Sequence, residues 1–129
     1  MTGSSGMIEG RIDNNVEAFV DLEIQLDDTT HTIAFLVDTG FNGFLSIPFR
    51  LVHQLGLPLS DVQQGVTADG RSSFFDTVEL TVIWHGNPLT VQAQVLDEPL
   101  LGTRLLRGSK IEAAWIQGGM FQIELILDG

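Results

Sequence analysis

Asp38, Thr39 and Gly40 are the residues of this sequence that most plainly suggest chemistry, because they follow directly on the apolar run 33–37. A carboxyl group beside a strand of buried type is costly unless its surroundings are built for it. Two carboxyls that share one site hold a single proton between them, and such a pair can activate a water molecule. Asp-Thr-Gly occurs once in the chain, so a second carboxyl would have to come from elsewhere.

The same three residues are also typical of an ordinary turn at the end of a strand. Asp and Thr side chains make local hydrogen bonds to the backbone there, and Gly supplies a positive φ. The tripeptide alone leaves both interpretations open, and the elements around it have to decide between them.

Short extended segments dominate the remaining pattern, and they must position Asp38. Near-alternating apolar residues predict a strand over 16–26, and a second strand over 31–37 pairs with it as a hairpin that delivers the carboxyl. Asp69-Gly70 predicts a further hairpin turn between extended runs. Alternation also predicts strands at 78–84 and 89–95, and Gly118-Gly119 predicts a turn in a closing hairpin of 111–116 and 120–127.

Two short helices interrupt this pattern. Ser46 is predicted to cap a helix that has Pro48 in its first turn and ends before Gly56. Leu51, Val52 and Leu55 would form its buried stripe, and Leu105 with Leu106 predicts a second, brief helix. Trp84, Trp115 and the eight Phe residues are expected in the core. These elements predict an all-β barrel or sandwich with one or two short helices.

Composition limits the classes of function. We expect one domain over 7–129, preceded by a disordered tail or artificial extension at 1–6. The net charge of −11 argues against a nucleic-acid partner. No apolar run is long enough to cross a bilayer, and no basic-then-apolar leader opens the chain. Without cysteine there is no thiol nucleophile and no disulfide. We therefore expect a cytoplasmic protein with no membrane partner.

Three elements in order resemble the retropepsin-type aspartic proteases. They are the strand and tripeptide Phe35-Leu36-Val37-Asp38-Thr39-Gly40, the hairpin turn at Ala68-Asp69-Gly70, and Leu100-Leu101-Gly102 leading into a short helix at 103–107. The resemblance covers roughly residues 8–125 and is closer to small prokaryotic members than to viral ones. Bulky Phe41 and the pair Thr103-Arg104 depart from the family pattern.

The resemblance implies a retropepsin-like closed β-barrel that works as a homodimer, with the two Asp38 carboxyls meeting on the two-fold axis. It implies an aspartic endopeptidase acting on peptide or protein substrates without a cofactor. Thr39 would hydrogen-bond across the dimer, and Gly40 would let the backbone approach substrate. Leu101 and Gly102 would support the active-site loop, and Ala68, Asp69 and Gly70 would form a flap over the peptide.

Two other kinds of catalytic site fit the sequence poorly. Ser46, His53 and Asp38 could be drawn as a hydrolase triad, but the Gly-x-Ser-x-Gly elbow is missing. The histidines at 31, 53 and 85 do not fall at metal-ligand spacings, so no metal site is expected. The serious alternative is a non-catalytic dimerisation or peptide-binding module with the same fold.

Overall fold

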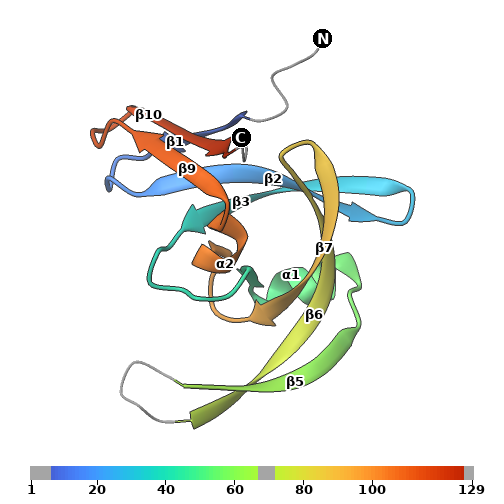
Figure 1. Ribbon diagram of the computed structural model, residues 1–129. Coiled ribbons are helices and arrows are strands. Elements are labelled where there is room, and N and C mark those ends of the chain that lie inside the picture. Colours follow the sequence, from blue (N-terminus) through green and yellow to red (C-terminus); the bar gives the residue numbers. More distant parts are fainter. Residues whose placement is uncertain (1–6, 67–71, 127–129) are drawn as a thin grey trace.

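The computed structural model describes residues 7–66 and 72–126 of the chain (Figure 1). Within these ranges the strands are β1 (Met7–Ile12), β2 (Ala18–Leu26), β3 (Thr29–Val37), β4 (Leu45–Ile47), β5 (Leu59–Val66), β6 (Ser72–Trp84), β7 (Asn87–Val95), β8 (Leu100–Leu101), β9 (Ser109–Ala113) and β10 (Met120–Leu125). The helices are α1 (Phe49–Leu55) and α2 (Thr103–Leu106). No helix in the described ranges is long and apolar enough to span a membrane.

Six of these strands close into a barrel, in the order β6-β7-β4-β8-β3-β2. Short pairings of Ile24 with Val82 and of Gln25 with Thr81 join β2 back to β6 and complete the ring. The prediction of a mostly β fold with a closed barrel and two short helices is therefore confirmed. Closure removes the open edges that a flat sheet of these strands would leave.

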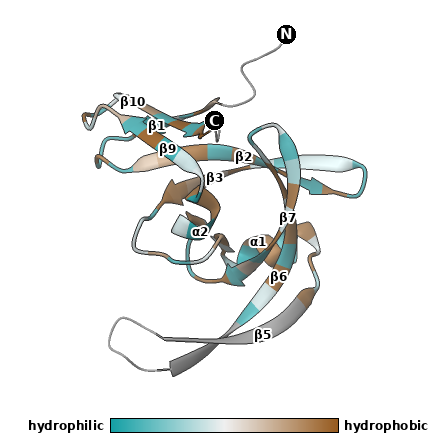
Figure 2. Ribbon diagram, viewed as in Figure 1, coloured by the Kyte–Doolittle hydropathy of each residue, from teal (hydrophilic) through white to brown (hydrophobic). Residues whose placement is uncertain are grey.

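Alternating side chains from the barrel strands build the core. Val20, Leu22 and Ile24 of β2 are buried, as are Val78, Leu80 and Val82 of β6, whereas Asp21, Glu23 and Glu79 between them are exposed. The alternation of apolar and polar positions is visible along these strands in Figure 2. This period of two is the pattern from which the strands were predicted. The burial of Val52, with Leu51 and Leu55 packed against the core, also confirms the apolar stripe of α1.

An outer sheet continues from the barrel, and we use this name for β1, β10 and β9. β1 pairs antiparallel with β2 on one side and with β10 on the other, and β10 pairs with β9. Strand β1 was not predicted, because residues 7–12 mix apolar, charged and glycine positions. Gly10 allows this strand to lie close to β2, since a Cβ atom there would collide with the carbonyl oxygen of Phe19.

Two chain reversals have residues that suit their backbone conformation. His85 and Gly86, which join β6 to β7, both have positive φ, at 50° and 82°. Such values fit the tight two-residue turn of an antiparallel hairpin. Gly56 ends α1 with a left-handed conformation at φ 67°, as predicted. The hairpin predicted around Asp69-Gly70 exists as β5 and β6, although its turn lies outside the described residues.

Two sequence predictions are wrong. Ser46 does not cap α1: it lies inside β4, is fully buried, and the residue before the helix is Pro48, which makes no side-chain cap. Trp115 is not in the core but 57% exposed on the turn between β9 and β10, and Phe49 is likewise 58% exposed. Both predictions rest on residue type alone. Whether a serine caps a helix and whether an aromatic side chain is buried depend on tertiary contacts, which residue type does not reveal.

Candidate functional site

Asp38 stands immediately after β3, where the chain leaves the barrel wall. The backbone N–H of Gly40 donates a hydrogen bond of 2.9 Å to Asp38 Oδ1, and the N–H of Phe41 donates one of 3.1 Å to the Asp38 carbonyl. These two bonds fold residues 38–41 into a tight turn. Asp38 is half-buried, while Thr39 and Gly40 are exposed. The carboxyl is thus held by its own loop yet remains accessible from outside.

One oxygen of the Asp38 carboxyl has no hydrogen-bond partner in the described part of the chain. Oδ1 accepts the Gly40 bond, and no hydrogen bond or ion pair to Oδ2 is found within the described residues. A carboxyl oxygen that is both accessible and unoccupied can accept a proton from water or donate one to a carbonyl. The turn therefore orients the Asp38 carboxyl through a hydrogen bond to Oδ1 and leaves Oδ2 able to interact with water or substrate.

The segment 99–104 holds this loop from beneath. Asp38 N–H donates to the Leu101 carbonyl at 3.0 Å, which extends the parallel pairing of β3 with β8 by one residue. On the other side of the loop, Gly102 N–H donates to the Phe44 carbonyl at 3.0 Å and Thr103 N–H donates to the Phe41 carbonyl at 2.9 Å. Both ends of the loop are thereby fixed to β8 and α2.

Gly102 occupies a position with no room for a side chain. A Cβ atom there would lie 2.7 Å from both the carbonyl oxygen and the Cδ2 atom of Phe41, and would collide with the carbonyl oxygen of Gly43. The close approach lets the loop pass directly over the start of α2. Next to it the guanidinium of Arg104 lies 5.6 Å from the ring centre of Phe44, a distance typical of a cation–π contact.

Five of the eight predicted site residues are thus brought together. Asp38, Thr39 and Gly40 form the exposed turn, and Leu101 and Gly102 lie buried beneath it. The other three, Ala68, Asp69 and Gly70, lie outside the described residues. The strands of their hairpin, β5 and β6, are described, and in Figure 1 the hairpin extends away from the rest of the barrel on the same side of the view as the loop that follows β3.

The hydrolase triad considered as an alternative is not assembled. The Ser46 hydroxyl donates a hydrogen bond of 2.7 Å to the Glu98 carbonyl and accepts one of 3.1 Å from the Leu100 N–H. It is fully buried and serves to join β4 to the segment before β8. His53 is exposed on α1. This structural role of Ser46 could not be inferred from sequence, because it depends on a contact across 52 positions.

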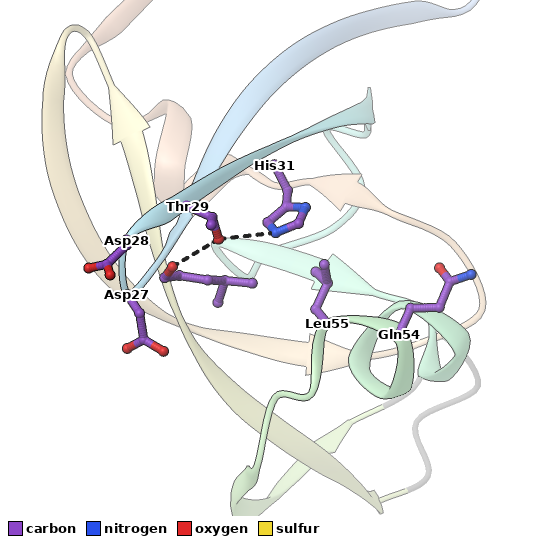
Figure 3. A pocket seen from close by; sticks show the side chains of 7 residues that line it. Asp27, Asp28, Thr29, His31, Gln54 and Leu55 are labelled. Atoms are coloured by element: carbon purple, nitrogen blue, oxygen red, sulfur yellow. Dashed lines mark hydrogen bonds between the residues drawn. The ribbon is translucent and has the colours of Figure 1, made fainter.

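The hollow shown in Figure 3, of about 360 Å³, lies between the β2–β3 turn and α1. Thr29 Oγ1 donates to the Leu26 carbonyl at 3.0 Å and lies 3.4 Å from His31 Nε2, while Asp27 and Asp28 stand on the other side of Thr29 in this view. The hollow is at the opposite end of β3 from Asp38, about 30 Å along an extended strand of this length. It therefore belongs to a different part of the surface.

In the described part of the chain, no three His, Asp or Glu residues lie close enough together to bind a metal ion. What the described residues offer is one oriented carboxyl per chain on a fixed loop. Comparisons with protein-family models, with curated proteins and with solved structures found no match to this chain.

Proposed function

We propose that this protein is an aspartic endopeptidase whose active site is completed by a second copy of the chain. The observation that carries the proposal is the loop at 38–41. It presents one accessible carboxyl at the end of a barrel strand, and it is fixed by backbone hydrogen bonds on both sides. The local bond from Gly40 to Asp38 Oδ1 is one that an ordinary turn also makes, and the additional bonds come from β8 and α2. A general acid or base needs such additional support, because catalysis depends on a fixed geometry.

The chemistry follows from bringing two such loops together. Two Asp38 carboxyls within hydrogen-bond distance share one proton, since like charges at that separation cannot both ionise. The ionised carboxyl takes a proton from a water molecule, which attacks the carbonyl carbon of the scissile peptide bond. The protonated carboxyl donates a hydrogen bond to the carbonyl oxygen as negative charge develops on it. When the C–N bond breaks, the carboxyl that took the proton from water gives it to the leaving amine, and the pair again holds one proton.

The outer sheet supports association of two copies. Among the described strands, β9 pairs with β10 alone, and Ile111, Trp115 and Ile116 on or beside this strand are 38%, 57% and 66% exposed. In Figure 1 the turn between β9 and β10 lies on the same side of the view as the loop after β3. Apolar residues next to an open strand edge are typical of surfaces that bury against another chain. A two-fold contact at this side would bring the two loops toward each other.

The direct test is peptide cleavage by the wild type and by Asp38→Asn. We expect the wild type to cleave members of a peptide library between about pH 4 and 7, and a statine-type inhibitor to suppress this cleavage. Asp38→Asn should keep its circular dichroism spectrum and lose cleavage, because an amide cannot take or give the proton. Cleavage that survives this substitution would exclude the mechanism.

Dilution provides a second test. Activity per chain should fall as the protein is diluted below the dissociation constant of the dimer, and a mixture of wild type with excess Asp38→Asn should lose activity through mixed dimers. Since each chain carries a net charge of −11, added salt should shift the fall to lower concentration by screening the repulsion. Sedimentation on the same samples would report the association state. A monomer with full specific activity would contradict the proposal.

A further inference from the structure

A second hollow, of about 310 Å³, adjoins the end of β3 that leads into Asp38. Leu36 lines this hollow and lies two residues before Asp38. The chain between them is extended, because Leu36 and Val37 pair with β8 and Asp38 N–H continues the same ladder. Side chains two residues apart on an extended chain leave the same face, about 7 Å apart. The hollow is therefore on the same side of the strand as the carboxyl.

The base of the hollow is apolar and comes from three separate elements. Phe19 of β2 is the direct cross-strand partner of Leu36, so their side chains stand next to each other. Pro99 completes the base, and its carbonyl accepts a hydrogen bond of 3.0 Å from the Leu36 N–H. The segment that carries Pro99 is further fixed through the Ser46 hydroxyl, which donates to the Glu98 carbonyl. The hollow is thus part of the supported structure around the loop.

The rest of the lining is charged. It contains the exposed acidic residues Glu17, Asp97 and Glu98 and one basic residue, Arg50 of α1. Among the described residues no ion pair joins Arg50 to any of these three carboxyls. A second cation, Arg11, lies 5.6 Å from the ring centre of Phe19, but its guanidinium pairs with Asp21 at 3.1 Å. Three carboxylates against the guanidinium of Arg50 therefore leave the lining with a net negative charge beside its apolar residues. A long side chain with an apolar stem and a cationic end matches both features.

We propose that this hollow is a specificity subsite that takes a lysine or arginine side chain of the substrate. The inference rests on the proposed peptidase function. The aliphatic stem lies on Phe19 and Leu36, and the cationic end reaches the carboxyls of Glu17, Asp97 and Glu98. Because the hollow is about one side-chain repeat from Asp38, the basic residue lies within two positions of the cleaved bond.

The test measures binding separately from cleavage. Asp38→Asn protein is titrated with three fluorescein-labelled peptide libraries that differ at one fixed position, which holds lysine, norleucine or glutamate. We expect the lysine library to bind about ten-fold more tightly than the norleucine library, as several partly exposed ion pairs would give, and the glutamate library to bind most weakly. The same libraries given to the wild type should show the same order in cleavage rate.

A matched pair of variants separates the subsite from the overall negative charge of the chain. Glu17→Gln, Asp97→Asn and Glu98→Gln combined should abolish the preference for lysine over norleucine. Glu23→Gln, Glu79→Gln and Glu112→Gln combined remove the same charge from exposed positions elsewhere and should leave the preference in place. Circular dichroism on both variants checks that each is folded.

The outcomes separate the two proposals. Equal binding of lysine and norleucine peptides, or an equal loss of preference in both charge variants, would overturn the subsite inference whether or not peptides are cleaved. A lysine preference that depends on the three carboxyls, in a protein that cleaves nothing, would overturn the peptidase proposal and leave a site for basic peptides. Inhibitor-sensitive cleavage without a preference for lysine would support the peptidase proposal and overturn the subsite inference.

Discussion

The part of the barrel beneath Asp38 and the outer sheet differ in two respects: how far their apolar side chains are buried, and how many neighbours their strands have. Beneath the Asp38 loop, Leu101 and Gly102 are buried, and β8 has hydrogen-bonded strands on both sides, β3 and β4. In the outer sheet, β9 has one neighbouring strand within the described part of the chain, and the turn that follows it exposes Trp115 and Ile116. The residues beneath the Asp38 loop are closed to further contacts, whereas the outer sheet leaves apolar side chains exposed next to the edge of β9.

This difference separates two tasks that the proposed function requires. A carboxyl that must meet its twin within hydrogen-bond distance needs a loop that cannot drift, and burial with backbone pairing provides that. Association of two chains needs an accessible surface, and the outer sheet provides that. Changes in the closed region should therefore alter unfolding free energy, whereas changes in the outer sheet should alter the association constant.

The largest effect on stability is expected for Gly102→Ala. The added methyl group would meet the backbone of Phe41 and Gly43, which are themselves fixed to α2, so the loop must move. We expect a loss of about 3 kcal/mol or more in the free energy of unfolding, measured by urea titration. Gly40→Ala is the control, since its new Cβ atom would meet the Asp38 side chain alone, at 3.2 Å. A smaller loss for Gly102→Ala than for Gly40→Ala would show that the support beneath the loop is not rigid.

Ser46→Ala should have the next largest effect. The substitution removes a hydroxyl that both donates to the Glu98 carbonyl and accepts from the Leu100 N–H, and nothing else at this buried position replaces it. The expected loss is about 2 kcal/mol. Thr81→Ala is a matched control, because it removes the partner of Thr90 in a surface hydroxyl pair and should change stability by about 0.5 kcal/mol or less. Equal losses in the two variants would contradict the structural role given to Ser46.

Much of the barrel was predictable because its signal is local. The alternation of Val20, Leu22 and Ile24 follows from the period of a half-buried strand, and Gly56 indicates the end of α1 because glycine adopts a positive φ there without strain. Strand β1 was not predicted because residues 7–12 show no alternation of apolar and polar residues, and the strand depends on its pairing with β2 and β10. The wrong capping role of Ser46 has the same origin, because its true partners lie more than fifty positions away.

The candidate site divides in the same way. Asp38 and its turn could be recognised from three adjacent residues and the strand before them. The packing of Leu101 and Gly102 beneath the loop required a resemblance, as nothing local relates residue 38 to residue 102. The hollow beside Leu36 was not anticipated at all. Its lining comes from four separate parts of the chain, and only the spacing of Leu36 from Asp38 could have hinted at it.

Trp115→Ser addresses the outer sheet directly. The indole is more than half exposed and its ring centre lies 6.1 Å from that of Phe121, so its loss should reduce monomer stability by about 1 kcal/mol or less. The dimer dissociation constant, measured by sedimentation, should rise at least about ten-fold if this turn is buried in the dimer. Phe49→Ser removes an equally exposed aromatic residue from α1 and should leave association unchanged. A similar effect of both substitutions would place the contact elsewhere.

The smallest effect is expected for Lys110→Gln on the open strand β9. Lys110 Nζ lies 3.3 Å from Glu124 Oε1, but both side chains are about half exposed, so water and salt screen the pair. The unfolding free energy should change by about 0.5 kcal/mol or less, and the change should vanish in high salt. Charged side chains on an open edge chiefly discourage unwanted strand pairing. Lys110→Gln also makes each chain more negative, so repulsion should weaken self-association slightly at low salt. In high salt, where this repulsion is screened, association should be unchanged or tighter, and weaker association there would mean that this lysine contacts the second copy.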